Sequence, residues 1–95
     1  MVSELTISSY VFLGKKRIQI LGDEYDYFGE VSRDGKAFGE GVAYSVENRG
    51  NKIAGTWYND LMNGLCIETR ESGSVTVSEY DMGTSHGKRT VYYFL

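Results

Sequence analysis

Short runs of strand-forming residues alternate with polar segments along the chain, and glycines mark the change from one to the other. Four of these glycines, Gly14, Gly39, Gly64 and Gly87, are spaced 25, 25 and 23 residues apart. The run after each of them is rich in Ile, Val, Tyr or Thr, which are common in β-strands. No stretch has apolar residues at i, i+3, i+4 and i+7 over the length that a helix needs. The pattern therefore predicts strands and no helix.

The other half of the repeat is marked by small residues ahead of these glycines. Gly55 lies nine residues before Gly64, and Ser78 lies nine before Gly87. Gly29 lies ten residues before Gly39, as if one residue were inserted. Polar segments rich in Gly, Asn, Asp and Ser follow in each copy and also join the copies. Turns are therefore predicted at residues 32–39, 59–64 and 81–87, and at 21–26, 47–51 and 71–74.

This spacing predicts an all-β fold, an antiparallel meander of repeated β-hairpins with about three and a half repeats. The first strand is expected within residues 4–12 and the last within 89–95, in a single domain that spans residues 1–95. The chain has no proline, so every backbone N–H in a strand is available to the ladder.

A repeat in which each hairpin packs only on its neighbours gives the glycines a role. Gly55 and Gly64 are expected where a ring or a backbone segment of the next strand comes close, or where φ is positive. The ring of Trp57 is expected to lie flat over the space that Gly55 leaves. The alternative is that these are ordinary strand glycines in an unrelated β-barrel or sandwich.

The motif resembles the MORN repeat (membrane occupation and recognition nexus), in which aromatic-x-Gly-x-aromatic is followed by a Gly, a Gly-x-Gly pair and a strand. The copies are Tyr27-Phe28-Gly29-Glu30 to Gly41, Ile53 to Cys66, and Thr76 to Arg89, where Cys66 and Arg89 replace the second Gly of the pair. A bacterial variant family of YwqK-like antitoxins is similar at this level. The resemblance implies a single sheet that contacts proteins, self-associates, and in some members binds acidic phospholipid.

Composition narrows the classes of function. The net charge of −3 argues against a dedicated nucleic-acid binder, which normally carries a basic excess. With one cysteine, no internal disulfide can form. The N-terminal residues lack the pattern of a signal peptide, and no apolar run is long enough to span a bilayer. A cytoplasmic location is the expectation.

Residues that could carry chemistry are few. The only histidine, His86, and the only cysteine, Cys66, cannot supply the four ligands of a structural zinc site. His86 is expected in a turn and Cys66 packed in a sheet, with a reactive thiol as the alternative for Cys66. An acidic cluster lacks the ligand spacing of a calcium loop and is expected to be a solvated turn, the alternative being a cation site or docking face. Its members are Asp23, Glu24, Asp26 and Glu30. No catalytic activity, metal or cofactor is expected.

Five basic residues are candidates for contact with lipid headgroups or phosphates, namely Lys15, Lys16, Arg17, Lys88 and Arg89. Because alternate residues of a strand point to opposite faces, only Lys15 and Arg17 of the first run share a face. The plain reading is solubilising strand ends. The functional reading is a modest basic stripe that binds anionic membrane lipid peripherally.

Aromatic residues are more numerous than one core face needs. The candidates for partner contact are Tyr44, Trp57, Tyr58, Tyr80, Tyr92, Tyr93 and Phe94. Trp57 and Tyr58 must point to opposite faces, as must Tyr92 and Tyr93. The competing interpretation is an ordinary core with scattered surface tyrosines. The apolar last strand should also leave an open edge that pairs with another chain.

The leading hypothesis is a small acidic, non-catalytic module that binds a protein partner through its sheet face or edge. Adaptor, inhibitor and immunity or antitoxin-type regulator are the roles that the resemblance suggests, with a phage-encoded inhibitor among them. A homodimer through the edge strand is expected. The second hypothesis is the peripheral membrane binding described above.

Overall fold

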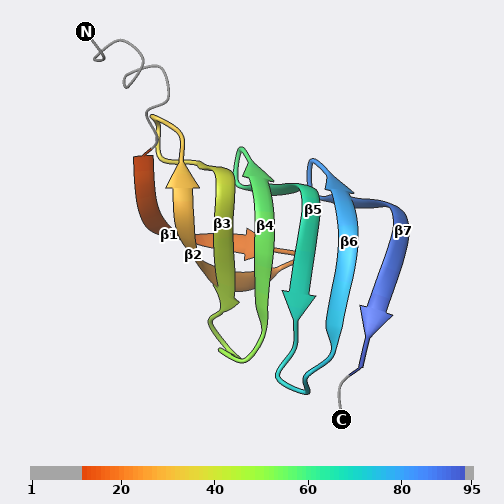
Figure 1. Ribbon diagram of the computed structural model, residues 1–95. Helices are drawn as coiled ribbons and strands as arrows, with labels where there is room; N and C mark the ends of the chain where they lie inside the picture. The colour runs from red at the N-terminus through yellow and green to blue at the C-terminus, as the bar shows by residue number, and fades with distance from the viewer. Residues whose placement is uncertain (1–11, 94–95) are drawn as a thin grey trace, which may run out of the picture.

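The computed structural model describes residues 12–93, and Lys88 by its backbone alone. These residues form seven strands of one antiparallel sheet, joined by hairpins in the order of the sequence (Figure 1). The strands are β1 (Phe12–Ile20), β2 (Asp23–Val31), β3 (Ala37–Ser45), β4 (Lys52–Tyr58), β5 (Leu61–Thr69), β6 (Val75–Asp81) and β7 (Thr84–Tyr92). The all-β antiparallel meander is thereby confirmed. The strand expected before residue 12 and the end of the last one lie outside the described residues.

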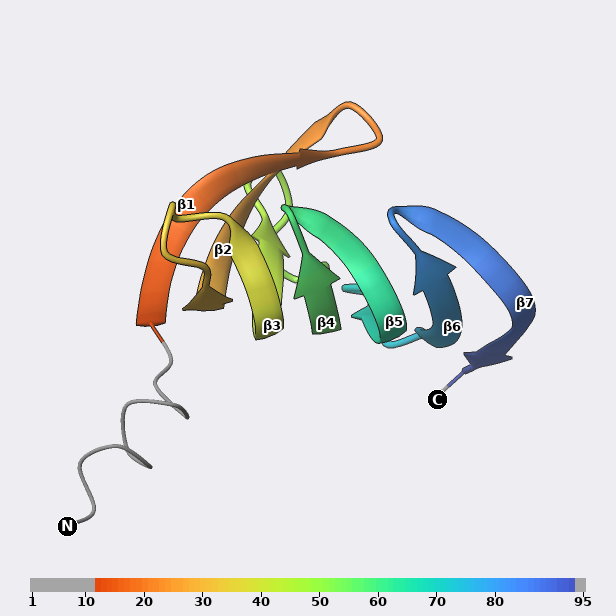
Figure 2. The ribbon, with the colours of Figure 1, turned by 90° about the horizontal axis from the view of Figure 1, so that it is seen from above.

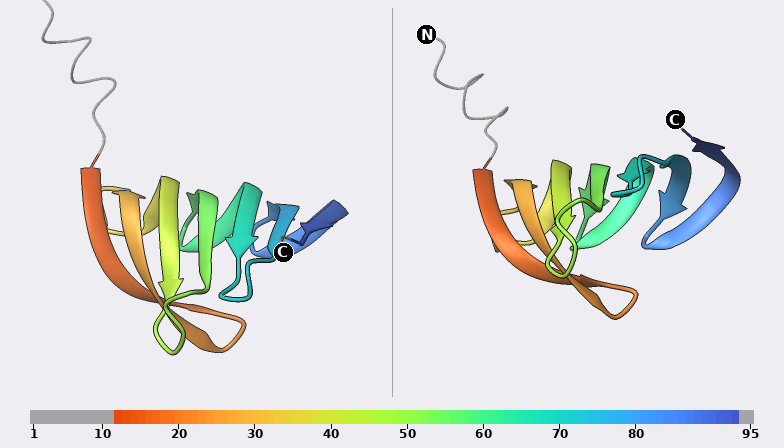
Figure 3. Two further views of the ribbon diagram at one scale, coloured as in Figure 1. Left: turned by 60° about the horizontal axis from the view of Figure 1, so that its bottom comes forward. Right: turned by 90° about the horizontal axis from the view of Figure 1, so that it is seen from below.

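The sheet is strongly curved, and the β1–β2 hairpin folds across one of its faces. In Figure 1 the tip of this hairpin passes behind β3 to β5, and Figure 2 shows it from above over the same strands. Figure 3 shows the tip from two further directions. The face toward which the hairpin folds is called the inner face below, and the opposite face is the outer face. The inner face of the sheet can therefore pack against the β1–β2 hairpin.

The core lies on the inner face. Alternation along each strand places one apolar set there. Its centre is Trp57, whose ring meets that of Tyr27 edge to face at 5.3 Å. The Trp57 Nε1–H donates to the carbonyl of Gly41 at 3.1 Å, and the Tyr27 hydroxyl donates to that of Glu30 at 2.7 Å. The buried apolar residues are Ile18, Tyr27, Ala37, Ala43, Ile53, Trp57, Met62 and Cys66, with Ile20, Tyr25, Val31 and Tyr80 packed against them.

Three of the four periodic glycines mark repeated β-bulges, whereas Gly14 pairs with Gly29 in the regular ladder of β1 and β2. Gly39, Gly64 and Gly87 have φ of 99°, 105° and 78°, a region that side chains rarely allow. Each lies on the second strand of a hairpin where the register shifts. In β4 and β5, for example, residues 63–65 face the single residue Thr56. These glycines therefore lie inside strands and not at the ends of turns as predicted, while the positive φ predicted as one option for Gly64 is confirmed.

The close approach of a backbone segment of the next strand, predicted as one option at Gly55, is also present. A Cβ at Gly55 would come 2.5 Å from the carbonyl oxygen of Leu65 and 2.7 Å from the Cys66 sulfur. The expectation that Trp57 covers Gly55 is wrong in this respect, because Cys66 fills that space and Trp57 bonds to Gly41 instead.

Turns between the strands are tighter than predicted. Three of them have two residues, Leu21-Gly22, Asn59-Asp60 and Met82-Gly83, all with positive φ, as in type I′ hairpins. The segments predicted as turns at 21–26, 59–64 and 81–87 are thus mostly strand. The residue inserted in the first copy lies in the 32–36 connection, where Gly35 has a φ of 85°.

Successive hairpins are joined by equivalent backbone hydrogen bonds. The N–H of Asp60 donates to the carbonyl of Ala37 at 3.1 Å, and the N–H of Gly83 donates to that of Met62 at 2.7 Å. In each case the two-residue turn of one hairpin bonds to the start of the second strand of the preceding hairpin. Asp60 also pairs with Lys16 of β1 at 2.9 Å. These bonds are the contacts between neighbours on which a repeat fold depends.

Candidate interaction surfaces

An apolar row crosses the outer face of the sheet. The cross-strand register aligns Phe28 with Val42, Val42 with Ala54, Ala54 with Ile67 and Ile67 with Val77, on five neighbouring strands. Phe28 and Ile67 remain 42% and 41% exposed. Among the described residues, no second layer of secondary structure covers this face. The set Phe28, Val42, Ala54, Ile67 and Val77 is called the outer apolar row below.

Two aromatic pairs lie on the outer face, one of them at Phe28 of the outer apolar row. Phe28 and Tyr44 meet edge to face, with ring centroids 5.9 Å apart. Farther along the strands, the rings of Phe38 and Tyr58 lie 5.4 Å apart, and both side chains are exposed. Ring pairs of this kind hold each other in place, so that they present apolar surface at little further entropic cost.

The aromatic residues singled out from the sequence are distributed over both faces. Tyr44, Tyr58 and Tyr92 lie on the outer face, whereas Tyr80 lies on the inner face. Trp57 is 2% exposed and belongs to the core, so it is not available to a partner in this structure. The opposite orientation of Trp57 and Tyr58 agrees with the alternation. Tyr93 follows β7 and is exposed, and Phe94 lies outside the described residues.

The basic residues do not form one stripe. Lys16 points inward to its partner Asp60, and Arg17 pairs with Asp26 at 2.7 Å and with Glu24 at 3.1 Å. Lys15 is exposed. Lys88 and Arg89 belong to β7, at the opposite end of the strand order from β1. Arg89 faces inward, as does its cross-strand partner Ser78.

Ion pairs and hydrogen bonds occupy most of the acidic cluster. Asp26 pairs with Arg17 and with Arg49 at 2.9 Å, and these arginines, with the hydrogen bond from Arg17 foremost, hold its pKa below the usual range. Glu30 accepts the N–H of Glu40 at 2.9 Å. The cluster is therefore divided between the two faces and is not one cation site.

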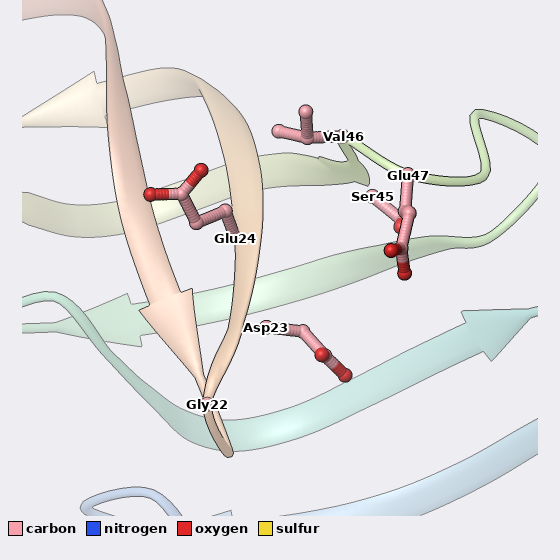
Figure 4. Close-up of a pocket in the computed structure, with 6 residues that line it drawn as sticks. All are labelled: Gly22, Asp23, Glu24, Ser45, Val46 and Glu47. Carbon is pink, nitrogen blue, oxygen red and sulfur yellow. The ribbon is translucent and has the colours of Figure 1, made fainter.

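Asp23 and Glu24 line a pocket of about 270 Å³ at the start of β2 (Figure 4). Glu47, from the β3–β4 connection, lies on its other side, and Glu24 points away from Asp23. Within residues 12–93, no three His, Cys, Asp or Glu side chains are grouped so that they could hold a metal ion.

His86 and Cys66 differ in their exposure to solvent. His86 is exposed in β7, inside a strand and not in the turn where it was expected. Cys66 is buried, and its sulfur lies 3.6 Å from the carbonyl oxygen of Thr56. Burial is the main cause that raises the pKa of the Cys66 thiol, which keeps it protonated and of low reactivity.

A groove of about 780 Å³ lies on the inner face, beneath the tip of the β1–β2 hairpin. Its floor includes Ile53 and Met62, and Tyr25 and Tyr80 line it from β2 and β6. Desolvation by burial, followed by the charge of Glu68, raises the pKa of both phenols. The sequence did not reveal this groove, because it forms only when the hairpin folds over distant strands.

The outer edge of β7 is open. β7 pairs with β6 on one side and has no partner strand on the other among the described residues. It spans Thr84–Tyr92 and contains no proline and no acidic residue, and its charged residues are the basic Lys88 and Arg89. Proline and charged side chains are common protections of an edge strand against pairing with other chains.

No protein-family model matches the chain, and no curated protein matches it either. In the part of the chain that the structure describes, no helix has the length and apolar character to cross a membrane.

Proposed function

We propose that this chain is a non-catalytic protein-binding module whose partner docks on the outer face of the sheet. The observation that carries the proposal is the outer apolar row, which runs without interruption over five strands and is partly exposed at Phe28 and Ile67. Contiguous apolar surface of this kind on a soluble domain commonly marks an interface. A partner that covers the row would supply the second layer that a single sheet lacks.

The surroundings of the row fit a protein interface better than a small-molecule site. Tyr44 and Tyr58 supply large rings with polar tips, which are enriched among residues that dominate binding energy. Charged side chains lie beside the row, where Lys15 continues it at one end. An apolar centre with a polar rim is the usual anatomy of protein interfaces.

The resemblance to MORN repeats agrees with a scaffold, adaptor or inhibitor role. A small regulator of the immunity or antitoxin type, or a phage-encoded inhibitor, would need only one such surface. The net charge of −3 favours a basic partner, because opposite charges speed the encounter and disfavour wrong partners. The competing hypothesis of anionic-lipid binding has less support, because Lys16 and Arg17 are engaged in ion pairs and Arg89 lies at the other end of the sheet.

Affinity capture from the native host, read by mass spectrometry, tests the proposal when matched variants are compared. Ile67→Glu places a charge in the middle of the row and should abolish capture of a protein that the unmodified chain retains. Met82→Glu is the control, because Met82 has the same exposure in the β6–β7 turn, off both faces. Capture that survives Ile67→Glu and Phe28→Glu would exclude the outer face. Flotation with anionic vesicles checks the lipid hypothesis, which predicts binding that salt removes.

A further inference from the structure

The open edge of β7 lies where the next hairpin of the repeat would pair, and the earlier strands show what covers an edge of this kind. β3 and β5 are the second strands of their hairpins, and each is paired along its far edge by the first strand of the next hairpin, β4 or β6. β7 is the equivalent strand of the β6–β7 hairpin, and no described strand pairs with its far edge. The bulge glycines Gly39, Gly64 and Gly87 mark the same place in the three strands. The repeat therefore holds two examples of an occupant that fits β7.

A backbone carbonyl at this edge lacks the donor that its counterparts have. The carbonyl of Met62, two residues before the bulge glycine of β5, accepts the N–H of Gly83 from the turn of the next hairpin. Ala37 of β3 accepts the N–H of Asp60 in the same way. The equivalent residue of β7 is Ser85, and among the described residues no following turn donates to it.

The orientation of Ser85 makes its backbone available. Thr84 and Asp81 flank a two-residue turn and pair with each other, so the ladder bonds to β6 belong to Thr84. The N–H and C=O of the next residue, Ser85, then point away from β6, as the carbonyl of Met62 points away from β4. An added strand can bond to both groups.

The register of the earlier hairpins also specifies an aromatic side chain on the added strand. Trp57 lies opposite Gly39 in the register of β3 and β4, and Tyr80 lies opposite Gly64 in that of β5 and β6. In both examples the two-residue turn begins two residues after the ring. By the same register, an aromatic residue is expected opposite Gly87.

A small residue precedes the ring in both examples. Gly55 pairs with Gly41, and Ser78 pairs with Cys66. The equivalent place in β7 is Arg89, two residues after the bulge glycine. A small residue opposite Arg89 leaves space for its long side chain. The first strand of the added hairpin thus has the pattern small-x-aromatic-x, followed by a two-residue turn.

Apolar surface on both faces of β7 would be covered by such a strand. Val91 and Tyr92 are 41% and 51% exposed and point to opposite faces, whereas Ala43, the equivalent of Val91 in β3, is fully buried between two neighbouring strands. The charged residues of β7 are the basic Lys88 and Arg89, and charges of this kind disfavour indiscriminate pairing of an edge. An occupant must therefore fit the places that the repeat defines.

We propose that the open edge of β7 binds a β-hairpin of a partner protein, which continues the repeat as its next hairpin. The first strand of this hairpin runs antiparallel to β7 and places its aromatic residue opposite Gly87. The second residue of its turn donates its N–H to the carbonyl of Ser85. A second copy of this chain does not supply the hairpin, because β4 and β6, which carry the pattern, lie inside the sheet.

This edge contact is separate from the other contacts of the chain. It does not involve the outer face, so the two proposals stand or fall separately. The homodimer expected from the sequence would use the same backbone groups of β7. A bound hairpin and a second copy of β7 therefore exclude each other.

A cyclic peptide made from residues 52–69 of this chain is the probe. It contains Gly55, Trp57 and the Asn59-Asp60 turn in the required order. Its ends are joined by a D-Pro-Gly turn, which the pairing of Lys52 with Thr69 allows, and its cysteine is replaced by serine. Cyclisation is needed because an isolated hairpin is only marginally stable in water. Labelled with a fluorophore, the probe should bind the unmodified chain in a polarisation assay.

Ser85→Pro tests the edge of the protein. Proline removes the outward N–H of this residue and obstructs an added strand, while the ladder bonds to β6 are kept. Gln19→Pro is the matched control, since Gln19 lies next to the pair that flanks the β1–β2 turn and directs its N–H to the open edge of β1. Ser85→Pro should weaken binding of the probe at least about tenfold relative to the unmodified chain and to Gln19→Pro.

Trp57→Ala in the probe tests the aromatic position and leaves the protein unchanged. It should weaken binding at least about tenfold, whereas Tyr58→Ala, which removes a ring from the opposite face of the probe, should cost less. Circular dichroism shows whether each protein variant keeps its sheet. A probe that does not bind, or equal binding by Ser85→Pro in a folded variant, overturns the proposal, whatever the outcome for Ile67→Glu. Equal binding by the probe without Trp57 overturns it as well.

Discussion

The ring of Tyr27 occupies the space that a side chain at Gly41 would need. A Cβ built on Gly41 would overlap the Tyr27 hydroxyl and two of its ring carbons. Both residues lie on the inner face, and Tyr27 is fully buried there. The missing side chain at Gly41 therefore lets a large ring lie against the backbone of β3, where the Gly41 carbonyl also accepts the Trp57 indole N–H.

Gly41→Ala should destabilise the protein strongly. The added methyl group forces the Tyr27 ring out of its place in the core, and Trp57 packs directly on that ring. We expect a loss of about 2–4 kcal/mol in the free energy of unfolding. Urea denaturation followed by tryptophan fluorescence measures it.

Gly14→Ala is the matched control. Gly14 lies in the same cross-strand row as Gly29 and Gly41, but its nearest neighbour would be a methyl group of Val31 at 3.3 Å, which can move slightly. The cost should be about 1 kcal/mol or less. Equal losses for the two substitutions would contradict the role given to Tyr27.

Leu21→Asn should stabilise the protein. Leu21 is 94% exposed in a two-residue turn and has a φ of 52°, where a leucine is strained and an asparagine is tolerated. The change creates the Asn-Gly turn that type I′ hairpins favour. We expect a gain of about 0.5–1 kcal/mol in the free energy of unfolding, measured by urea or thermal denaturation.

Leu13→Asn serves as the comparison for that gain, because Leu13 is also highly exposed but lies within β1. Asparagine is disfavoured in strands, so no stabilisation is expected there. A gain of the same size at both positions would mean that lost apolar exposure, and not turn geometry, is responsible.

Much of the fold could be predicted from glycine spacing, because three of the periodic glycines adopt a backbone conformation that few other residues tolerate. A bulge with positive φ at Gly39, Gly64 and Gly87 restricts each position to glycine, and the repeat of the bulge makes the spacing regular. Turn lengths were overestimated for the same reason. The bulge glycine looked like part of the turn, although three strand residues, beginning with Leu61, separate Asp60 from Gly64.

The surfaces could be predicted only in part. Alternation predicted that Trp57 and Tyr58 face opposite ways, but it did not say which face would be buried. That choice depends on the β1–β2 hairpin, which folds over the inner face and covers Trp57's side of the sheet. The groove between Tyr25 and Tyr80 has no local sequence signal, since the two residues lie on β2 and β6.

Alkaline pH should destabilise the protein, partly through Tyr27. Burial, the largest cause, raises the pKa of Tyr27 to about 12, whereas an unfolded tyrosine titrates near about 10. The folded state thus holds the proton more tightly, and the stability that this gives is complete below about pH 10 and is lost as the pH rises toward 12. At most about 2–3 kcal/mol is involved.

Urea denaturation at several pH values measures this loss. The series runs from neutral pH to about 11.5, which lies in the upper part of that window. In Tyr27→Phe the slope of stability against pH above about 10 should decrease, although the variant is less stable at neutral pH because the bond to Glu30 is lost. Tyr25 and Tyr80, whose pKa values are also raised, should leave a residual slope. An unchanged slope would show that Tyr27 ionises as easily in the folded state as in the unfolded one.

Self-association should occur through the open edge of β7. An edge strand offers unpaired backbone groups to a second copy, and two antiparallel copies of β7 would extend the sheet across a two-fold axis. Light scattering at increasing concentration should show a dimer for the unmodified chain. Tyr92→Lys, which places a charge on this strand, and deletion of residues 93–95 should both give monomers.

Tyr58→Lys makes the same change on the outer face of β4 and should stay dimeric. Loss of the dimer in Tyr58→Lys alone would move the contact to the outer face, and a monomeric parent at every concentration would rule out the edge contact.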